Sequence, residues 1–251
     1  MQLCLALTPG ESREPGPRPR LLAHVAYRLG KSVLLRQDLP LGTRGGFLSL
    51  SDREAPPVTA PEQMASMLLR ECAQRGYSGV IADFEQSPTP DRTTLLQTLL
   101  RHKDSALHLL VPEAFALPGA TVLVNTAVSG GSVAERLREA IRQYPSAALD
   151  LQRTMMDFTL PAPSGEGRPL TVESLAELRR QLAPAVFFSP ELCARYFTYT
   201  QNGQTHFVLF DDAETLRQKM RIAEPMGYRL ALVMYPEVKD LLTPLFGSGS
   251  R

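Results

Sequence analysis

Two carboxylic acids, Asp83 and Glu85, follow an apolar run at residues 79–82. Side chains alternate along a β-strand, so Ile81, Asp83 and Glu85 would share one face. The strand rise would place the two acidic residues about 7 Å apart at Cα. That spacing suits a division of labour in which one carboxyl donates a proton and the other stabilises charge. The same residues also fit a surface loop after a core strand, and on this stretch alone both interpretations stay open.

The segments on either side of this run predict helices. Thr59 and Glu62 form a capping-box pattern ahead of a helix that Gly76 ends. Asp91 can cap a second helix, which follows the two carboxylates. A strand between two helices is typical of a β/α repeat, and catalytic residues of α/β barrels lie at the C-terminal ends of the strands.

The chain as a whole predicts an α/β fold, a TIM-type (β/α)8 barrel that forms a single domain over residues 1–251. Its length of 251 residues is typical of one such barrel. Residues 21–29, closed by Gly30, predict a short helix. The N-terminal third is short, which indicates a compact or partly degenerate barrel. Apolar runs that predict strands lie at residues 2–7, 32–36, 47–50, 79–85, 106–111, 121–125, 147–158, 185–189 and 229–235.

A β-hairpin is predicted late in the chain. Asn202-Gly203 separates two strand-like runs at residues 196–200 and 206–210, and Asn-Gly is a strong signal for a two-residue hairpin turn. We therefore expect a late β-hairpin insertion in the barrel.

The long run at residues 147–158 carries polar side chains on one parity. Asp150, Gln152, Thr154 and Met156 would share a strand face. In a barrel that face would point at a ligand pocket, whereas in an edge strand it would face solvent. Both interpretations stay open.

Composition and residue spacing give no sign of nucleic-acid, membrane or metal binding. The net charge is +1, so no overall field favours nucleic acid or an acidic membrane. The three cysteines are widely spaced, and the four histidines show no metal-ligand spacing. No apolar run reaches transmembrane length, and the N-terminus lacks the shape of a signal peptide. We expect no metal and no cofactor, and a cytoplasmic or spore-associated location.

Three stretches resemble glycoside hydrolase family 18, the chitinase-like barrels. Residues 196–216 are similar to the late hairpin and a following helix in the bacterial branch linked to spore and cell-wall peptidoglycan. Residues 79–85 resemble the fourth-strand signature Asp-Gly-x-Asp-x-Asp-x-Glu, and residues 155–158 resemble the sixth-strand Met-x-Tyr-Asp motif. The resemblance extends over roughly residues 60–240.

The resemblance implies retaining, substrate-assisted hydrolysis of β-linked N-acetylglucosaminyl glycans, of peptidoglycan or chitin type. Glu85 would protonate the leaving oxygen, and Asp83 would orient the acetamido group of the substrate. The residues expected to bind the substrate are Asp157, Met156, Gln152, Tyr235 and Met234.

The sequence also departs from the family. Ile81 stands at the second Asp of the signature, and Met156 stands at the Tyr of the sixth-strand motif. The family usually ends its eighth strand with a Trp, whereas this chain has no Trp and that place falls on Met234 or Tyr235. An active hydrolase and an inactive barrel that binds glycan or a protein partner are therefore both open. A barrel with unrelated chemistry is a third interpretation, because fold does not fix function.

Overall fold

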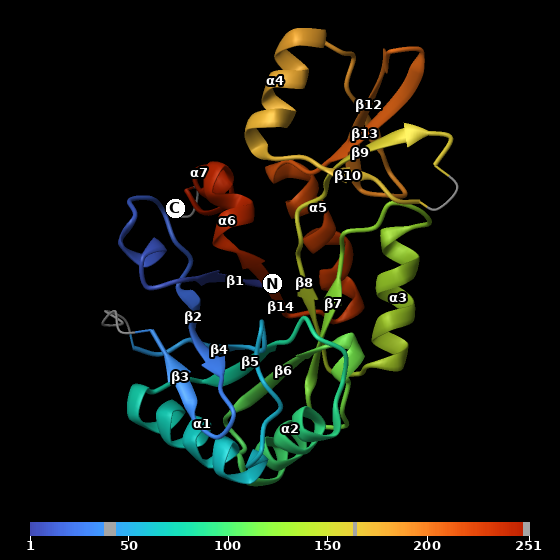
Figure 1. Ribbon diagram of the computed structural model, residues 1–251. Helices are drawn as coiled ribbons and strands as arrows, with labels where there is room; N and C mark the ends of the chain where they lie inside the picture. Colours follow the sequence, from blue (N-terminus) through green and yellow to red (C-terminus); the bar gives the residue numbers. More distant parts are fainter. Residues whose placement is uncertain (38–43, 163–164, 248–251) are drawn as a thin grey trace.

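The computed structural model describes residues 1–37, 44–162 and 165–247, and eight parallel strands form a closed barrel (Figure 1). The barrel closes because β1 pairs in parallel with both β14 and β2. This confirms the predicted TIM-type fold. In chain order the barrel strands are β1 (Gln2–Leu7), β2 (Leu21–Leu29), β4 (Phe47–Ser51), β5 (Gly79–Asp83), β6 (His108–Pro112), β7 (Thr121–Asn125), β8 (Ala147–Asp150) and β14 (Leu230–Met234).

The outer layer of helices is uneven. In the described residues, α-helices lie in four connections between barrel strands, namely α1 (Pro61–Arg75), α2 (Pro90–His102), α3 (Val133–Gln143) and α5 (Ala213–Ala223). Short 3-10 helices, η1 (Glu11–Arg13) and η2 (Glu113–Phe115), lie in the β1–β2 and β6–β7 connections. After β14 the chain forms α6 (Tyr235–Val238) and α7 (Leu242–Phe246). The sequence predicts a compact or partly degenerate barrel, and the structure has all eight strands with α-helices in only four of the described connections between them.

Residues 21–29 form strand β2, so the predicted helix there is wrong. Strand β2 is hydrogen-bonded to β1 on one side and to β4 on the other, and β3 (Leu34–Arg36) pairs antiparallel with its end. Ala23 faces the barrel interior and Tyr27 packs in the outer core. A strand buried on both faces has no polar side, so its sequence lacks the alternation that distinguishes a strand from a helix.

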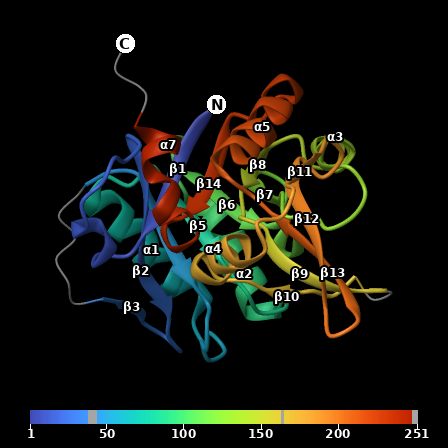
Figure 2. The ribbon, with the colours of Figure 1, turned by 90° about the horizontal axis from the view of Figure 1, so that it is seen from above.

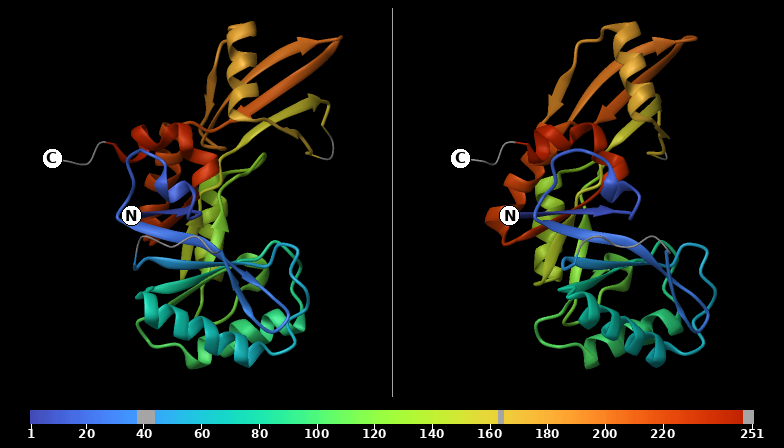
Figure 3. Two further views of the ribbon diagram at one scale, coloured as in Figure 1. Left: turned by 60° about the vertical axis from the view of Figure 1, so that its left-hand side comes forward. Right: turned by 90° about the vertical axis from the view of Figure 1, so that its left-hand side faces the viewer.

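An α/β lobe is inserted between β8 and β14. Its five-stranded antiparallel sheet is ordered β10-β9-β13-β12-β11, and one helix covers one face of it. Figure 3 shows the lobe standing on the barrel, and the view from above shows it over one side, away from β2 and β3 (Figure 2). The elements are β9 (Met155–Leu160), β10 (Arg168–Pro169), α4 (Val172–Leu182), β11 (Phe187–Ser189), β12 (Ala194–Gln201) and β13 (Gln204–Phe210).

The predicted hairpin is confirmed, and it belongs to this larger lobe. Strands β12 and β13 pair antiparallel from Arg195 opposite Phe210 to Gln201 opposite Gln204. The turn residues Asn202 and Gly203 both have positive φ, at 52° and 75°. This conformation fits Asn-Gly because glycine has no Cβ and asparagine tolerates the left-handed region.

Two strand predictions near the lobe are wrong. The run at residues 147–158 is not one strand, because β8 ends at Asp150 in the barrel and β9 starts at Met155 in the lobe. The segment at residues 185–189 is not a buried core strand. It contains the edge strand β11, where Phe187 is 53% exposed.

Helix caps follow the sequence only in part. Ser132 caps α3 by accepting the Glu135 N–H, whereas Ala60 rather than the predicted Thr59 precedes α1 and makes no side-chain cap. Asp91 lies in the first turn of α2, where its carboxylate accepts the Val58 N–H at 2.6 Å. It therefore ties the preceding loop to α2 instead of capping the helix.

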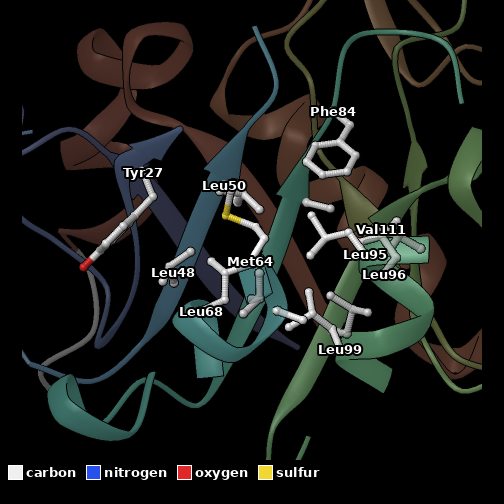
Figure 4. Packing of buried hydrophobic residues seen from close by; sticks show 14 of the residues in the cluster. Tyr27, Leu48, Leu50, Met64, Leu68, Phe84, Leu95, Leu96, Leu99 and Val111 are labelled. Atoms are coloured by element: carbon white, nitrogen blue, oxygen red, sulfur yellow. The ribbon is translucent and has the colours of Figure 1, made fainter. Parts of the chain in front are cut away.

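Two apolar layers support the barrel. Outside the sheet, one apolar cluster joins the barrel strands to α1 and α2, and Figure 4 shows Leu48 and Leu50 of β4 beside Met64 and Leu68 of α1. Inside the barrel, the filling side chains are of small or medium size except for one ring, and they comprise Cys4, Ala6, Ala23, Phe47, Ile81, Leu110, Leu123, Ala148 and Leu232. Since side chains of one parity point inward along each strand, the residues two positions after Ile81, Leu123 and Ala148 also face the barrel axis, at its C-terminal end.

Candidate active site

A cavity of about 550 Å³ opens at the C-terminal ends of the barrel strands. This is the end at which α/β barrels place catalytic residues. Acidic and amide side chains dominate its polar lining, which consists of Ser49, Asp83, Glu85, Glu113, Asn125, Asp150, Gln152 and Glu237. Apolar residues of the barrel interior, including Ile81 and Leu232, form its floor.

Asp83 and Glu85 both line this cavity, as the sequence predicts for one strand face. Asp83 is the last residue of β5 and is half-buried, whereas Glu85 lies just beyond the strand and is exposed. Burial raises the pKa of Asp83 to about 6, and the charges of Glu85 and Asp52 add to the increase. The pair therefore combines an accessible carboxyl with a more buried one whose pKa is raised.

The segment that carries Glu85 is anchored to Asp52, a fully buried residue directly after β4. Asp52 Oδ1 accepts the Glu85 N–H at 2.8 Å, and the Asp52 carbonyl accepts the Gln86 side-chain amide at 2.6 Å. Arg92 on α2 forms a buried ion pair with Asp52, with 3.0 Å between Nε and Oδ2. Arg92 also donates to Gln86 Oε1 at 3.0 Å, so three side chains fix the backbone direction after β5.

Asp150 enters the cavity from the end of β8. Gln152 Nε2 donates to Asp150 Oδ2 at 2.8 Å, and Asn125 Nδ2 at the end of β7 donates to Gln152 Oε1 at 2.9 Å. Burial is the main cause that raises the pKa of Asp150 to about 7. The charges of Glu237, Asp83 and Glu113 add to it, and the Gln152 hydrogen bond opposes it.

Glu237 completes the acidic wall from α6. Its Oε2 accepts the Arg153 N–H at 3.1 Å, and Arg153 in turn donates to the Glu237 carbonyl at 2.9 Å and pairs with Asp240 at 2.6 Å. Burial raises the pKa of Glu237, and the Arg153 contacts oppose that increase. Arg153 thereby joins α6 to the start of the lobe beside the cavity.

The predicted binding residues do not all gather at this cavity. Gln152 and Met234 line it. Tyr235 is buried in α6, and its hydroxyl donates to Glu14 at 2.8 Å. Asp157 and Met156 lie on β9 in the lobe sheet, outside the cavity lining.

Asp157 has partners of its own in the lobe. It is buried and accepts hydrogen bonds from Tyr199 at 2.9 Å and His206 Nδ1 at 3.0 Å, and it pairs with Arg168 at 3.2 Å. These partners come from β12, β13 and β10, so Asp157 connects the strands of the lobe sheet.

The assignment of residues 155–158 to the sixth barrel strand is wrong. Counted along the chain, the sixth barrel strand is β7, and it ends at Asn125. The signal was present in the alternation of Leu123 with Asn125, because both side chains line the cavity. Asp52, Glu113 and Glu237 were not predicted at all.

The described residues contain no group of three or more His, Cys, Asp or Glu side chains that could hold a metal ion. Over the same described ranges, no helix is long and apolar enough to cross a membrane. The cavity at the mouth is lined by carboxyl and amide groups, which can exchange protons and hold polar ligands.

Comparison with solved structures shows the fold. The chain is similar to the spore cortex-lytic enzyme SleL of Bacillus cereus (TM-score 0.67, 16% identity, 98% of this chain and 74% of that one). It is also similar to a chitinase of Chromobacterium violaceum (TM-score 0.66, 15% identity, 100% of this chain and 99% of that one). A class V chitinase of Nicotiana tobaccum in complex with NAG4 matches with a TM-score of 0.68 and 12% sequence identity, over 97% of this chain and 96% of that one.

No family model and no curated protein sequence matches the chain. The similarity thus lies in the structure, at sequence identities of 12% to 16%. The chain has the fold of the chitinase-like family 18 barrels, which confirms at the level of the fold the resemblance seen in its sequence.

Proposed function

We propose that this protein is a retaining glycoside hydrolase for β-linked N-acetylglucosaminyl glycans. The observation that carries the proposal is the position of Asp83 and Glu85 together in one cavity at the C-terminal mouth of the barrel. The fold shared with chitinases and with a spore cortex-lytic enzyme supports the substrate class. The glycan would be of peptidoglycan or chitin type, and the protein would be cytoplasmic or spore-associated.

Glu85 acts as the acid in this proposal. It is exposed at the cavity rim, so a bound glycan would remove water from it and place the scissile oxygen within reach of its proton. Asp52 connects the backbone at Glu85 to α2, because it accepts the Glu85 N–H and forms an ion pair with Arg92 on that helix. A fixed acid shortens the search for a productive geometry.

Asp83 orients the substrate. In substrate-assisted hydrolysis the acetamido oxygen of the sugar attacks the anomeric carbon, and the enzyme supplies no nucleophile, which departs from the usual two-carboxylate scheme. The Asp83 carboxylate would accept the acetamido N–H and stabilise the positive charge that forms on the intermediate. Because Asp83 lies deeper than Glu85, its charge acts in a medium of low dielectric constant, where it is more effective.

Asn125 supplies a neutral hydrogen-bond donor at the end of the sixth barrel strand. Asn125 lies at the end of the sixth barrel strand and lines the cavity, and its Nδ2 points to Gln152 within the same lining. We assign to this amide the hydrogen bond to the acetamido oxygen. Met234, at the end of β14, provides an apolar floor where the family usually has a Trp.

A glycan-binding barrel without catalysis is the second candidate function. Ile81 in place of an acidic residue and the absence of Trp favour it, because both changes remove groups that hold or polarise a sugar. The two candidates share the cavity and differ in turnover alone.

Hydrolysis of fluorogenic N-acetylglucosamine oligomers and of purified peptidoglycan tests the proposal. Glu85→Gln keeps the size of the side chain and removes the proton donor, so turnover should fall by at least about a hundredfold. Glu139→Gln, on the exposed face of α3, is the matched control and should leave the rate unchanged. Absence of turnover in the native protein on every substrate, together with glycan binding, would support the binding barrel instead.

A further inference from the structure

Asp83 and Asp150 reach the barrel mouth from opposite parts of the sheet. Asp83 ends β5, the fourth barrel strand, and Asp150 ends β8, the seventh. Each lies two residues after a side chain that fills the barrel interior, Ile81 and Ala148 respectively. Both therefore point inward, and both line the same cavity of about 550 Å³.

Neither carboxyl has a cationic partner among the described residues. The nearby arginines are engaged elsewhere, since Arg92 pairs with Asp52, Arg136 with Glu113, and Arg153 with Asp240. The other charged groups that face the pair are carboxyls, namely Glu85 and Asp52 beside Asp83, and Glu237 and Glu113 beside Asp150. Two carboxyls that share a cavity and lack cations of their own, as Asp83 and Asp150 do, lose their protons one after the other as the pH rises.

Asp150 is held in place by neutral groups. The amide of Gln152 fixes its Oδ2, and Asn125 fixes Gln152. In the described part of the chain, the other oxygen of Asp150 has no hydrogen-bond partner. The amide fixes the position of Asp150, and the surrounding acids favour its protonated form against the opposing effect of the Gln152 hydrogen bond.

We propose that Asp150 is the proton-bearing neighbour of Asp83, and that it replaces, from the seventh strand, the acidic residue that the fourth-strand signature has where this chain has Ile81. Asp150 is thus a positioning residue, which acts on the substrate through Asp83. The inference rests on the proposed hydrolase function for its catalytic consequence, but the pairing itself is a property of the free protein.

The order of ionisation follows from the surroundings of the two groups. The pKa of Asp83 is raised to about 6 by burial, while that of Asp150 is raised to about 7 by burial and by the charges of Glu237 and Asp83. Because Asp150 faces the charge of Asp83 as well as that of Glu237, Asp83 ionises first and Asp150 keeps its proton. A carboxylate beside a protonated carboxyl is the state that the orienting role of Asp83 requires.

The pairing is tested without substrate by carboxyl ¹³C NMR titration of the full-length protein. In Asp83→Asn one of the charges that raise the pKa of Asp150 is gone, while burial and the charge of Glu237 remain, so the titration midpoint of Asp150 should fall by about half a pH unit. Asp104→Asn, at an exposed position, is the control and should leave that midpoint unchanged. An unchanged Asp150 midpoint in Asp83→Asn would overturn the pairing, whether or not the protein hydrolyses glycans.

The catalytic consequence is tested by the pH profile of kcat/KM. Asn at position 150 can keep the hydrogen bond from Gln152 but cannot lose a proton, so Asp150→Asn should move the alkaline limb of the profile, which Glu85 then sets alone, while the acid limb set by Asp83 persists. If Asp150 had a purely structural role, Asp150→Asn would lower the rate without moving the alkaline limb. That outcome would refute the proposal that Asp150 acts on the substrate through Asp83. If the Asp150 midpoint shifts in Asp83→Asn but the native protein shows no turnover, the pairing of Asp83 with Asp150 stands and only the hydrolase function is overturned.

Discussion

The backbone N–H of Glu85 donates a 2.8 Å hydrogen bond to the carboxylate of Asp52, which is fully buried and lies 33 residues earlier in the chain. The third and fourth barrel strands are thereby joined at the point where the fourth ends in the candidate acid. Arg92 neutralises Asp52 from α2, so the site depends on an ion pair that touches no substrate.

Removal of Asp52 should destabilise the protein strongly. Asp52→Ala leaves the buried Arg92 without its counter-charge, and we expect the free energy of unfolding to fall by about 3–5 kcal/mol. Urea denaturation followed by circular dichroism measures this loss. Asp52→Leu combined with Arg92→Met removes both charges and should recover most of the stability, and a double variant as unstable as Asp52→Ala would contradict the argument.

The acidic wall should make stability depend on pH in a defined direction. The folded-state pKa of Asp150 is about 7, above the value of about 4 expected in the unfolded chain. Its contribution is therefore fully present below pH 4 and is lost as the pH rises through 7. Asp150→Asn should be as stable as the native protein at pH 4 and more stable at pH 8, by roughly 2–4 kcal/mol. Equal stability of the two proteins across this range would show that Asp150 ionises freely in the folded state.

The barrel could be predicted from sequence where its strands are short apolar runs between clear helices. The strands β5, β6 and β7 and the first two long helices follow this pattern, and the structure places them as expected. Strand β2 could not be predicted because it is buried on both faces and rich in residues that also suit a helix. The division of residues 147–158 between the barrel sheet and the lobe sheet could not be predicted either, because only four residues separate β8 from β9.

The candidate site could be predicted only where it is local in sequence. Asp83 and Glu85 were found because they lie at one strand end, whereas Glu237 lines the same cavity from α6 and Asp52 anchors Glu85 from the end of β4. No short-range spacing connects such residues. Asp157 shows the converse, because a local motif suggested a pocket residue and the tertiary structure gives it Tyr199 and His206 as partners.

Asp157 should matter for stability more than for turnover. Asp157→Asn weakens the ion pair with Arg168 and the hydrogen bonds from Tyr199 and His206, so the protein should lose about 1–3 kcal/mol. Its kcat/KM on short oligomers should stay within about twofold, because Asp157 does not line the mouth cavity. Thermal denaturation and oligomer kinetics separate the two effects. A hundredfold loss of kcat at native stability would restore the pocket role predicted from the sequence.

The sequence assigns the position of the family's Trp to either Met234 or Tyr235, and the two residues have different surroundings in the structure. Met234 lines the cavity floor, whereas Tyr235 is 4% exposed and bonded to Glu14. Met234→Ala removes apolar contact area, so we expect binding of N-acetylglucosamine oligomers to weaken by about 1–2 kcal/mol, a five- to thirtyfold rise in Kd measured by calorimetry. Tyr235→Phe is the matched variant, because it loses the Glu14 hydrogen bond and keeps the ring, and its Kd should not change. A rise in Kd for Tyr235→Phe with none for Met234→Ala would mean that α6 rearranges when the glycan binds, so that the buried tyrosine becomes part of the sugar site.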